Sequence, residues 1–129
     1  MNNELSKTSA TNTFKPEVSV VVPIYNGTTD LPELINCLLS QTYPKDKVEY
    51  LLVDNNSSDG TFELLKLVLE NSPIKIRALS EKEIQSSYAA RNTGIREGSG
   101  EIIAFTDADC RPQPQWLEEL VQPFINQNI

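Results

Sequence analysis

Apolar and polar residues follow two patterns that alternate along the chain from residue 18 onward. Nearly continuous apolar runs, which predict strands buried on both faces, cover residues 18–24, 48–53 and 102–105. Apolar residues at helical spacing cover residues 31–39, 62–69, 88–95 and 116–121. Residues 74–79 alternate between apolar and basic positions, as in a more exposed strand. This succession predicts an α/β fold with a Rossmann-like, doubly wound and mostly parallel sheet.

Residues typical of helix ends support these boundaries. Asp30, with Glu33 three residues later, is expected to cap the helix that follows it. Ser87 is expected to cap the helix over residues 88–95 in the same way. Pro123 is expected to break the last helix, because a proline in a helix interior has no backbone N–H to donate.

Length and composition favour one domain. With 129 residues, of which 39% are hydrophobic, the chain can bury one core but not two. Residues 1–15 are rich in Asn, Ser and Thr, so we expect a flexible N-terminal tail before a domain over residues 16–129. No apolar run can span a bilayer, and the first residues lack the pattern of a secretory signal. We therefore expect a cytoplasmic protein without a transmembrane segment.

Charge and residue types exclude several functions. The formal net charge of -7 disfavours binding to nucleic acid or to an anionic membrane surface. The chain contains no histidine, which excludes Ser-His-Asp and Cys-His catalysis and every zinc site that needs histidine. Cys37 and Cys110 lie far apart and form no CxxC pair, so neither a disulfide framework nor a thiolate metal site is supported.

Polar residues follow three of the predicted buried strands. Tyr25 and Asn26 come after the first, Asp54 after the second, and Asp107 and Asp109 after the last. In a parallel sheet these positions meet at the carboxyl edge, where ligands bind. Alternate side chains of an extended segment point the same way, so the Asp-x-Asp pair can face one divalent cation, Mg²⁺ or Mn²⁺. The alternative interpretation is a turn at a strand end, where aspartate is common.

Other candidates also have two interpretations. Asp54 could accept hydrogen bonds from a ribose or a base, or it could cap a turn. Arg91 could reach a nucleotide, or it could pair with a neighbouring carboxylate. The polar segment over residues 55–60 fits a turn with Asp59 as a helix cap, and nothing in the sequence marks Cys110 as reactive.

Four segments, in this order and at these spacings, resemble the family 2 glycosyltransferases. They are VSVVVPIYNG over residues 18–27, VDNNSSDGT over 53–61, AARNTG over 89–94 and FTDAD over 105–109. The resemblance covers the chain from about residue 17 to its end. It implies a GT-A fold, a nucleotide-sugar donor that usually carries UDP, a divalent cation and inversion at the anomeric carbon.

The resemblance also implies roles for individual residues. Pro23, Tyr25 and Asn26 would line the nucleotide pocket, Asp54 would hold the uracil or ribose side, and Arg91 would lie against the nucleotide. The metal-linked pair would be Asp107 and Asp109, with Asp107 also counted among the donor-binding residues. The acceptor would be a sugar or a lipid, and peripheral membrane association of the full-length protein is compatible with this interpretation.

One part of the family pattern is missing from the sequence. An inverting transfer needs a general base on the acceptor side, and the only acids after the Asp-x-Asp pair are Glu118 and Glu119, which fit a solvated helix face. We therefore expect the donor-binding half of such an enzyme, with the catalytic base beyond Ile129. The main alternative is a non-catalytic nucleotide-binding domain. A receiver-like signalling module is less favoured, because no acidic pair follows the first strand.

Overall fold

The computed structural model describes residues 15–126 as an α/β domain. In chain order the elements are β1 (Val18–Ile24), α2 (Leu31–Leu39), the short 3₁₀ helix η1 (Lys45–Lys47), β2 (Val48–Asp54), α3 (Thr61–Val68), β3 (Lys75–Ser80), α4 (Ser87–Glu97), β4 (Ile102–Phe105) and α5 (Trp116–Asn126). The flexible tail predicted for residues 1–15 falls, except for Lys15, outside the described residues. Lys15 itself forms an ion pair with Glu118 at 2.6 Å.

The four strands form one parallel sheet in the order β3-β2-β1-β4. This order is that of the first four strands of a Rossmann sheet, whereas receiver-like domains begin with the order 2-1-3. The predicted Rossmann-like sheet is therefore confirmed, and the strand order argues against the receiver-like alternative.

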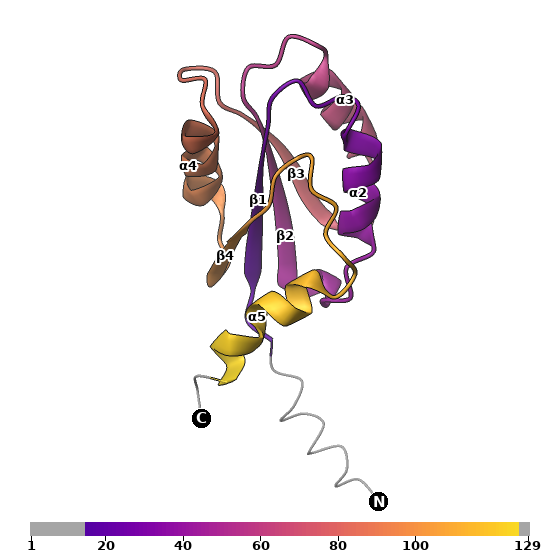
Figure 1. Cartoon of the computed structure of the whole chain (residues 1–129), viewed down its shortest axis with the longest axis vertical. Coiled ribbons are helices and arrows are strands. Elements are labelled where there is room, and N and C mark those ends of the chain that lie inside the picture. Colours follow the sequence, from indigo (N-terminus) through magenta and orange to yellow (C-terminus); the bar gives the residue numbers. More distant parts are fainter. Residues whose placement is uncertain (1–14, 127–129) are drawn as a thin grey trace, which may run out of the picture.

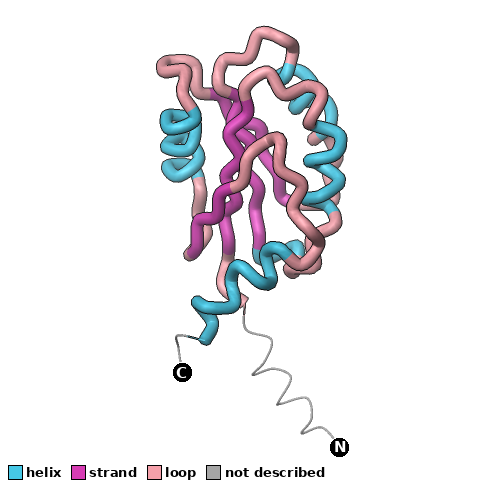
Figure 2. Tube along the Cα trace, viewed as in Figure 1, coloured by secondary structure: helices cyan, strands magenta, loops and turns pink. Residues whose placement is uncertain are grey.

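Helices cover both faces of the sheet, with α2 and α3 on one side and α4 on the other (Figures 1 and 2). The two cores follow from the alternation of side chains along each strand. The larger core buries Val20, Val22 and Ile24 of β1 together with leucines of α2 and α3. Val21 of β1 faces the other way and packs in a smaller core with Ala90 of α4.

The burial predicted for the two outer strands is confirmed for β3 and wrong for β4. The third strand is partly exposed, as its alternating pattern predicts. The prediction that residues 102–105 form a strand buried on both faces is wrong, because Ala104 is its one buried residue and Phe105 is 43% exposed. Within residues 15–126, β4 pairs only with β1, so it lies at an edge of the sheet.

Three helices differ from the sequence prediction, two in where an end lies and one in how its end is capped. The cap of α4 is Ser86 rather than Ser87, and its Oγ accepts a hydrogen bond from the Ala89 N–H at 3.1 Å. Asp30 occupies the cap position of α2, but its side chain makes no cap hydrogen bond. Pro123 lies inside α5, which continues to Asn126, because an exposed proline near a helix end removes only one hydrogen bond. No helix among the described residues has the length and apolarity to cross a membrane.

Candidate functional site

The carboxyl edge of the sheet carries a pocket of about 130 Å³ between β1, the start of α4 and the loop after β4. Its lining residues are Pro23, Ile24, Tyr25, Asn55, Ser87 and Asp107. Pro23 and Tyr25 were predicted for a nucleotide pocket, and Asp107 for the donor site. Four segments that are far apart in the sequence therefore meet at this pocket. Larger hollows, such as one of about 500 Å³ beside the start of β3, contain no aspartate pair.

The loop after β1 presents Tyr25 and uses Asn26 for its own structure. The Tyr25 side chain is 55% exposed, so its ring is accessible to a ligand. Asn26 has a φ of 50°, a left-handed conformation that asparagine tolerates better than most residues. Its Oδ1 accepts a hydrogen bond from the Ser58 N–H at 2.9 Å, and its own N–H donates to Ser57 Oγ at 2.8 Å. The Asn26 side chain thus joins the loops after β1 and β2.

Asp54 and Asn55 lie at the end of β2 and face opposite sides of the sheet. Asp54 pairs in register with Ile24, whose side chain belongs to the core under α2 and α3. The Asn55 N–H donates to the Ile24 carbonyl at 2.8 Å, which extends the ladder by one residue and places Asn55 on the α4 side. Asn55, and not Asp54, therefore lines the pocket.

The hydrogen bonds of these two side chains also differ. Asp54 is 3% exposed; its Oδ2 accepts from the Ser57 N–H at 3.3 Å, while its buried Oδ1 has no partner. The Asn55 amide donates to the carbonyl oxygens of Glu81 at 3.0 Å and Ile84 at 2.9 Å. Both donors of Asn55 are thus occupied by the loop after β3, and its Oδ1 accepts no hydrogen bond from the described residues.

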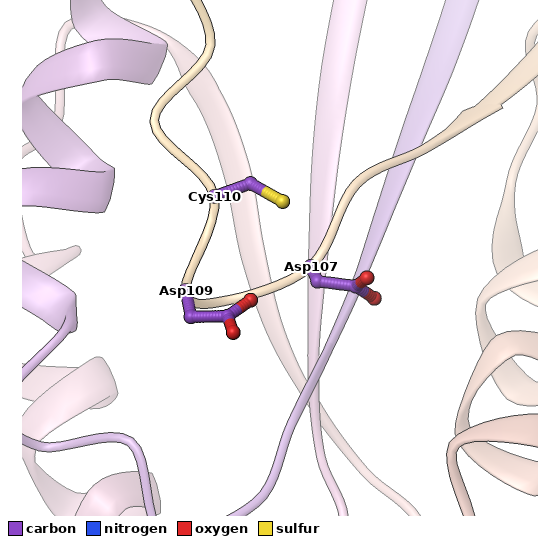
Figure 3. Close-up of side chains that lie close together, drawn as sticks. All are labelled: Asp107, Asp109 and Cys110. Atoms are coloured by element: carbon purple, nitrogen blue, oxygen red, sulfur yellow. The ribbon is translucent and has the colours of Figure 1, made fainter.

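Asp107 and Asp109 lie together in the loop after β4, as predicted. Ligand atoms of Asp107, Asp109 and Cys110 are all within 4.8 Å of one another, and Figure 3 shows the Asp109 and Cys110 side chains pointing toward the part of the loop that carries Asp107. The reason differs from the predicted one, because a turn closed by the Cys110 N–H and the Asp107 carbonyl at 3.0 Å, and not an extended segment, brings them together. The sequence patterns did not predict Cys110 as a member of this cluster.

Arg91 reaches the same loop from α4. Its Nη2 lies 3.6 Å from Asp107 Oδ1, and the two side chains are 37% and 58% exposed. This is the ion pair with a neighbouring carboxylate that was one of the two interpretations of Arg91. Because the carboxylate belongs to Asp107, the pair also places a guanidinium group beside the pocket.

Asp59, in the loop after β2, connects that loop to the loop after β1 and to the start of α3. It accepts hydrogen bonds from the Thr61 N–H at 3.1 Å at the start of α3 and from the Thr28 hydroxyl at 3.0 Å. Burial favours a higher pKa for Asp59, but the hydrogen bonds from Thr61 and Thr28 outweigh it and hold the pKa below 3.8. Asp59 therefore binds the start of α3, but the cap residue of that helix is Gly60, so the prediction of Asp59 as the cap is wrong by one position.

Comparison with known proteins decides the family. Residues 19–128 match the family model described as glycosyl transferase family 2. The chain belongs to this family. The GT-A fold implied by the sequence resemblance is confirmed by solved structures of family members.

One curated relative and two solved structures show how much of a family 2 protein the chain represents. The glycosyltransferase AglE of Haloferax volcanii is 50% identical over 103 residues, which is 80% of this chain and 34% of AglE. The mannosyltransferase PcManGT of Pyrobaculum calidifontis, in complex with GDP-Man and Mn²⁺, superposes with a TM-score of 0.77 at 33% identity, over 88% of this chain and 32% of that one. S. aureus TarS in complex with UDP superposes with a TM-score of 0.74 at 27% sequence identity, over 86% of this chain and 32% of the TarS chain. The chain thus spans about a third of the length of these proteins.

Proposed function

We propose that this chain binds the nucleotide-sugar donor, of the UDP class, in a glycosyl transfer that depends on a divalent cation. The observation that carries the proposal is the meeting of the pocket with the Asp107 and Asp109 carboxylates at the carboxyl edge of the sheet. Family membership and neighbours that hold UDP, UDP-GlcNAc or GDP-Man support the same conclusion.

The nucleoside would occupy the pocket beside β1. Pro23 and the exposed Tyr25 ring supply apolar surface for a base, and Asn55 Oδ1 supplies an acceptor for the N–H of a uracil. Asp54 is proposed for the uracil or ribose side, supported by its buried Oδ1, which has no partner although buried carboxylate oxygens are normally hydrogen-bonded. Asn26 would shape the pocket through the loop bonds of its side chain rather than contact the donor directly.

The diphosphate would lie over the loop after β4. Carboxylate oxygens from Asp107 and Asp109 are the donor type that Mn²⁺ and Mg²⁺ prefer, and their spacing within 4.8 Å fits one ion. Such an ion, when bound, neutralises the diphosphate and stabilises it as a leaving group. Arg91 would add a second positive charge on the α4 side, within reach of the same oxygens.

Calorimetric titration of the chain with UDP, UDP-GlcNAc and GDP, each in Mn²⁺ and in EDTA, tests the proposal. We expect UDP and UDP-GlcNAc to bind in Mn²⁺ and to bind at least about tenfold more weakly in EDTA. UDP at about 100 times its Kd should stabilise the fold by about 2.7 kcal/mol. Equal affinity in Mn²⁺ and EDTA would contradict the metal assignment, and tighter binding of GDP than UDP would contradict the uracil assignment.

Variants of the aspartate pair locate the metal. Asp107→Asn combined with Asp109→Asn should abolish the Mn²⁺ dependence of UDP binding without unfolding the chain, because all three side chains of the cluster are exposed. The matched control is Asp46→Asn, an exposed acid in η1 at the opposite end of the sheet. If both variants bind UDP and Mn²⁺ like the wild type, the two aspartates are ordinary turn residues.

We also propose that the transfer inverts the anomeric carbon and that the acceptor is a sugar or a lipid. The support is the family membership of the chain. With the full-length protein and an acceptor that takes up label from a UDP-sugar, the proton coupling constant at the new anomeric centre would distinguish inversion from retention. A product with the donor's own anomeric configuration would contradict the proposal.

A further inference from the structure

We propose that Arg111 is a positioning residue that holds the metal loop, defined as residues 107–110, in its ligand-binding shape. The metal part of this inference rests on the proposed function. Its structural part does not, because it concerns contacts that Arg111 makes within the chain itself. Neither the family comparison nor the sequence patterns assigned a role to this arginine.

Arg111 connects the metal loop to the start of α2. Its Nη2 donates to Asp30 Oδ1 at 2.8 Å, and its Nε donates to Glu33 Oε1 at 3.0 Å. Its Nη1 points back into the metal loop, where it donates to the carbonyl oxygens of Ala108 and Cys110, both at 2.9 Å. The guanidinium group thus binds two carboxylates on one element and two carbonyls on another.

The metal loop has few other fixed points. On the upstream side the Thr106 N–H donates to the Val21 carbonyl at 3.3 Å, and on the downstream side Gln41 Nε2 donates to the Gln113 carbonyl at 2.7 Å. Between these two points, the hydrogen bonds that link residues 107–112 to other described elements all come from Arg111. The remaining polar contact is the longer Arg91–Asp107 ion pair at 3.6 Å.

Asp109 depends most on this restraint. Its carboxylate is exposed and makes no hydrogen bond or ion pair with the described residues 15–126, so its position follows from the backbone of the loop alone. That backbone is held through the two carbonyls flanking Asp109, which are the ones that Arg111 binds. A loss of Arg111 would therefore release Asp109 first.

The same contacts explain why Asp30 and Glu33 do not form the predicted capping box. Both carboxylates point to Arg111 instead of to the backbone of α2. A guanidinium group can serve these four acceptors because its donors lie in a fixed planar fork, whereas a lysine ammonium is a single point of charge. The side chain is also partly shielded, with 32% of it exposed.

Position and charge predict opposite effects on metal binding. Removal of a positive charge close to two metal-binding carboxylates would strengthen cation binding if electrostatics alone mattered. Release of the loop would weaken cation binding, because the ligands would have to be ordered when the metal binds. The sign of the change in Mn²⁺ affinity therefore separates the two roles.

The first test measures Mn²⁺ affinity by electron paramagnetic resonance for the whole chain with Arg111→Gln and with Arg111→Lys. We expect both variants to bind Mn²⁺ about 10- to 100-fold more weakly, the usual range for residues that orient metal ligands. Arg111→Lys keeps the positive charge, so a loss of Mn²⁺ affinity in this variant would be due to the changed geometry of the side chain. Unchanged or tighter binding in both variants would overturn the proposal.

Arg77→Gln is the matched control. Arg77 also forms an ion pair with a glutamate, Glu97, at 2.8 Å, but it lies in the middle of β3, away from the metal loop. We expect its Mn²⁺ affinity to equal that of the wild type. A loss as large as that of Arg111→Gln would mean that removal of any such ion pair weakens the site, which would overturn the specific role of Arg111.

The second test needs no metal. Hydrogen exchange of the Cys110 N–H, which donates to the Asp107 carbonyl, should be faster in Arg111→Gln and Arg111→Lys than in the wild type and in Arg77→Gln. Faster exchange here, in a chain that binds no Mn²⁺, would contradict the proposed function while supporting the restraint. Unchanged exchange would overturn the restraint itself. If Arg111→Gln fails to fold, Arg111→Lys decides both tests.

Discussion

At the scale of single residues, the alternation of side chains along β2 separates two neighbours. Asp54 ends the strand on the side of α2 and α3, and Asn55 follows on the side of α4 and the pocket. Both residues are only 3% exposed, but Asn55 is the one that lines the pocket. For a ligand in this pocket, Asn55 is therefore the nearer of the two side chains.

Our first prediction compares alanine variants of these two residues. Asn55→Ala should weaken UDP binding about 2- to 10-fold, because a neutral hydrogen bond contributes about 0.5–1.5 kcal/mol. Asp54→Ala should weaken it about tenfold to a hundredfold if its carboxylate contacts the nucleoside, since bonds to charged groups contribute about 1.5–3 kcal/mol. Neither variant should change the affinity for Mn²⁺ alone. Calorimetry with UDP and with Mn²⁺ measures both quantities.

Each variant has its own decisive outcome. Asn36→Ala, at an exposed position of α2, serves as the control and should bind UDP like the wild type. Unchanged UDP affinity in Asn55→Ala would show that this side chain only fastens the loop after β3. Unchanged affinity in Asp54→Ala would assign that carboxylate to the turn before α3, where it binds the Ser57 N–H.

Glu49 has a structural role at the opposite end of the sheet. Its Oε2 accepts hydrogen bonds from the Ser19 hydroxyl of β1 and, at 2.7 Å, from the Ser99 N–H in the loop before β4. Burial acts to raise the pKa of Glu49, but the hydrogen bonds from Ser19 and Ser99, with the charge of Arg77, outweigh burial and leave the pKa below 4.5. The ionised carboxylate therefore stabilises the folded state.

Our second prediction follows from this lowered pKa. A group whose pKa is lower in the folded than in the unfolded state stabilises the fold above its unfolded pKa and loses that contribution as pH falls through the folded value. Relative to Glu49→Gln, the wild type should be more stable at pH 7, and the difference should shrink as pH falls below 4.5. Urea unfolding of both proteins from pH 7 to pH 3 measures it. A pH-independent difference would contradict the prediction.

At the scale of elements, the smaller core depends on how closely α4 approaches β1. A Cβ added at Gly94 would lie 2.4 Å from Val21 Cγ1, far inside contact distance. Gly94 itself is buried in the middle of α4, where glycine costs about 1 kcal/mol of helix propensity relative to alanine. The close approach, which sets where Arg91 and Ser87 meet the pocket, therefore outweighs propensity at this position.

Our third prediction is that Gly94→Ala destabilises the fold despite the better helix propensity. Overpacking of a core typically costs about 1–3 kcal/mol, more than the propensity gain. Combining it with Val21→Ala should reduce this loss, because the nearest clashing atoms, Cγ1 and Cγ2, are removed. The free energy of unfolding of the two single variants and the double variant gives the coupling. Additive effects would show that the contact with Val21 is not the cause.

At the scale of the whole molecule, α5 closes the lower end of the larger core (Figure 1). Leu117 and Val121 are both fully buried there, while Leu120 of the same helix is 40% exposed. The Leu117 N–H donates to Gln41 Oε1 at 3.1 Å, and Glu118 pairs with Lys15 before β1. The last described helix thus contacts the residues before β1 and packs against the larger core.

Our fourth prediction uses the two leucines of α5 as a matched pair. Leu117→Ala should lower the free energy of unfolding by about 2–5 kcal/mol, the range for a large-to-small change in a core. Leu120→Ala makes the same chemical change at an exposed position and should alter stability by no more than about 0.5 kcal/mol. Urea unfolding measures both. Equal losses would mean that helix propensity, not burial, determines the contribution of α5.

The sequence by itself determined the order and type of the elements and the edge of the sheet where the polar residues gather. The runs at β1 and β2 are apolar because both faces of these central strands are covered, and side chains after parallel strands meet at one edge. The Asp107 and Asp109 pair was predicted for this reason. The strand β4 was misjudged, because an apolar run does not tell whether a second neighbour covers the strand.

Only the tertiary structure decided which of the polar residues face the pocket and which hold the loops. Asp30 and Glu33 match a local capping pattern, yet Arg111, about 80 residues away in the chain, binds both of them. The sequence predicts Asn26 for the nucleotide pocket and Asp59 as a helix cap, yet the side chains of both form hydrogen bonds between the loops after β1 and β2. A local sequence pattern indicates which hydrogen bonds a side chain can make. Long-range packing determines which possible partner lies within bonding distance.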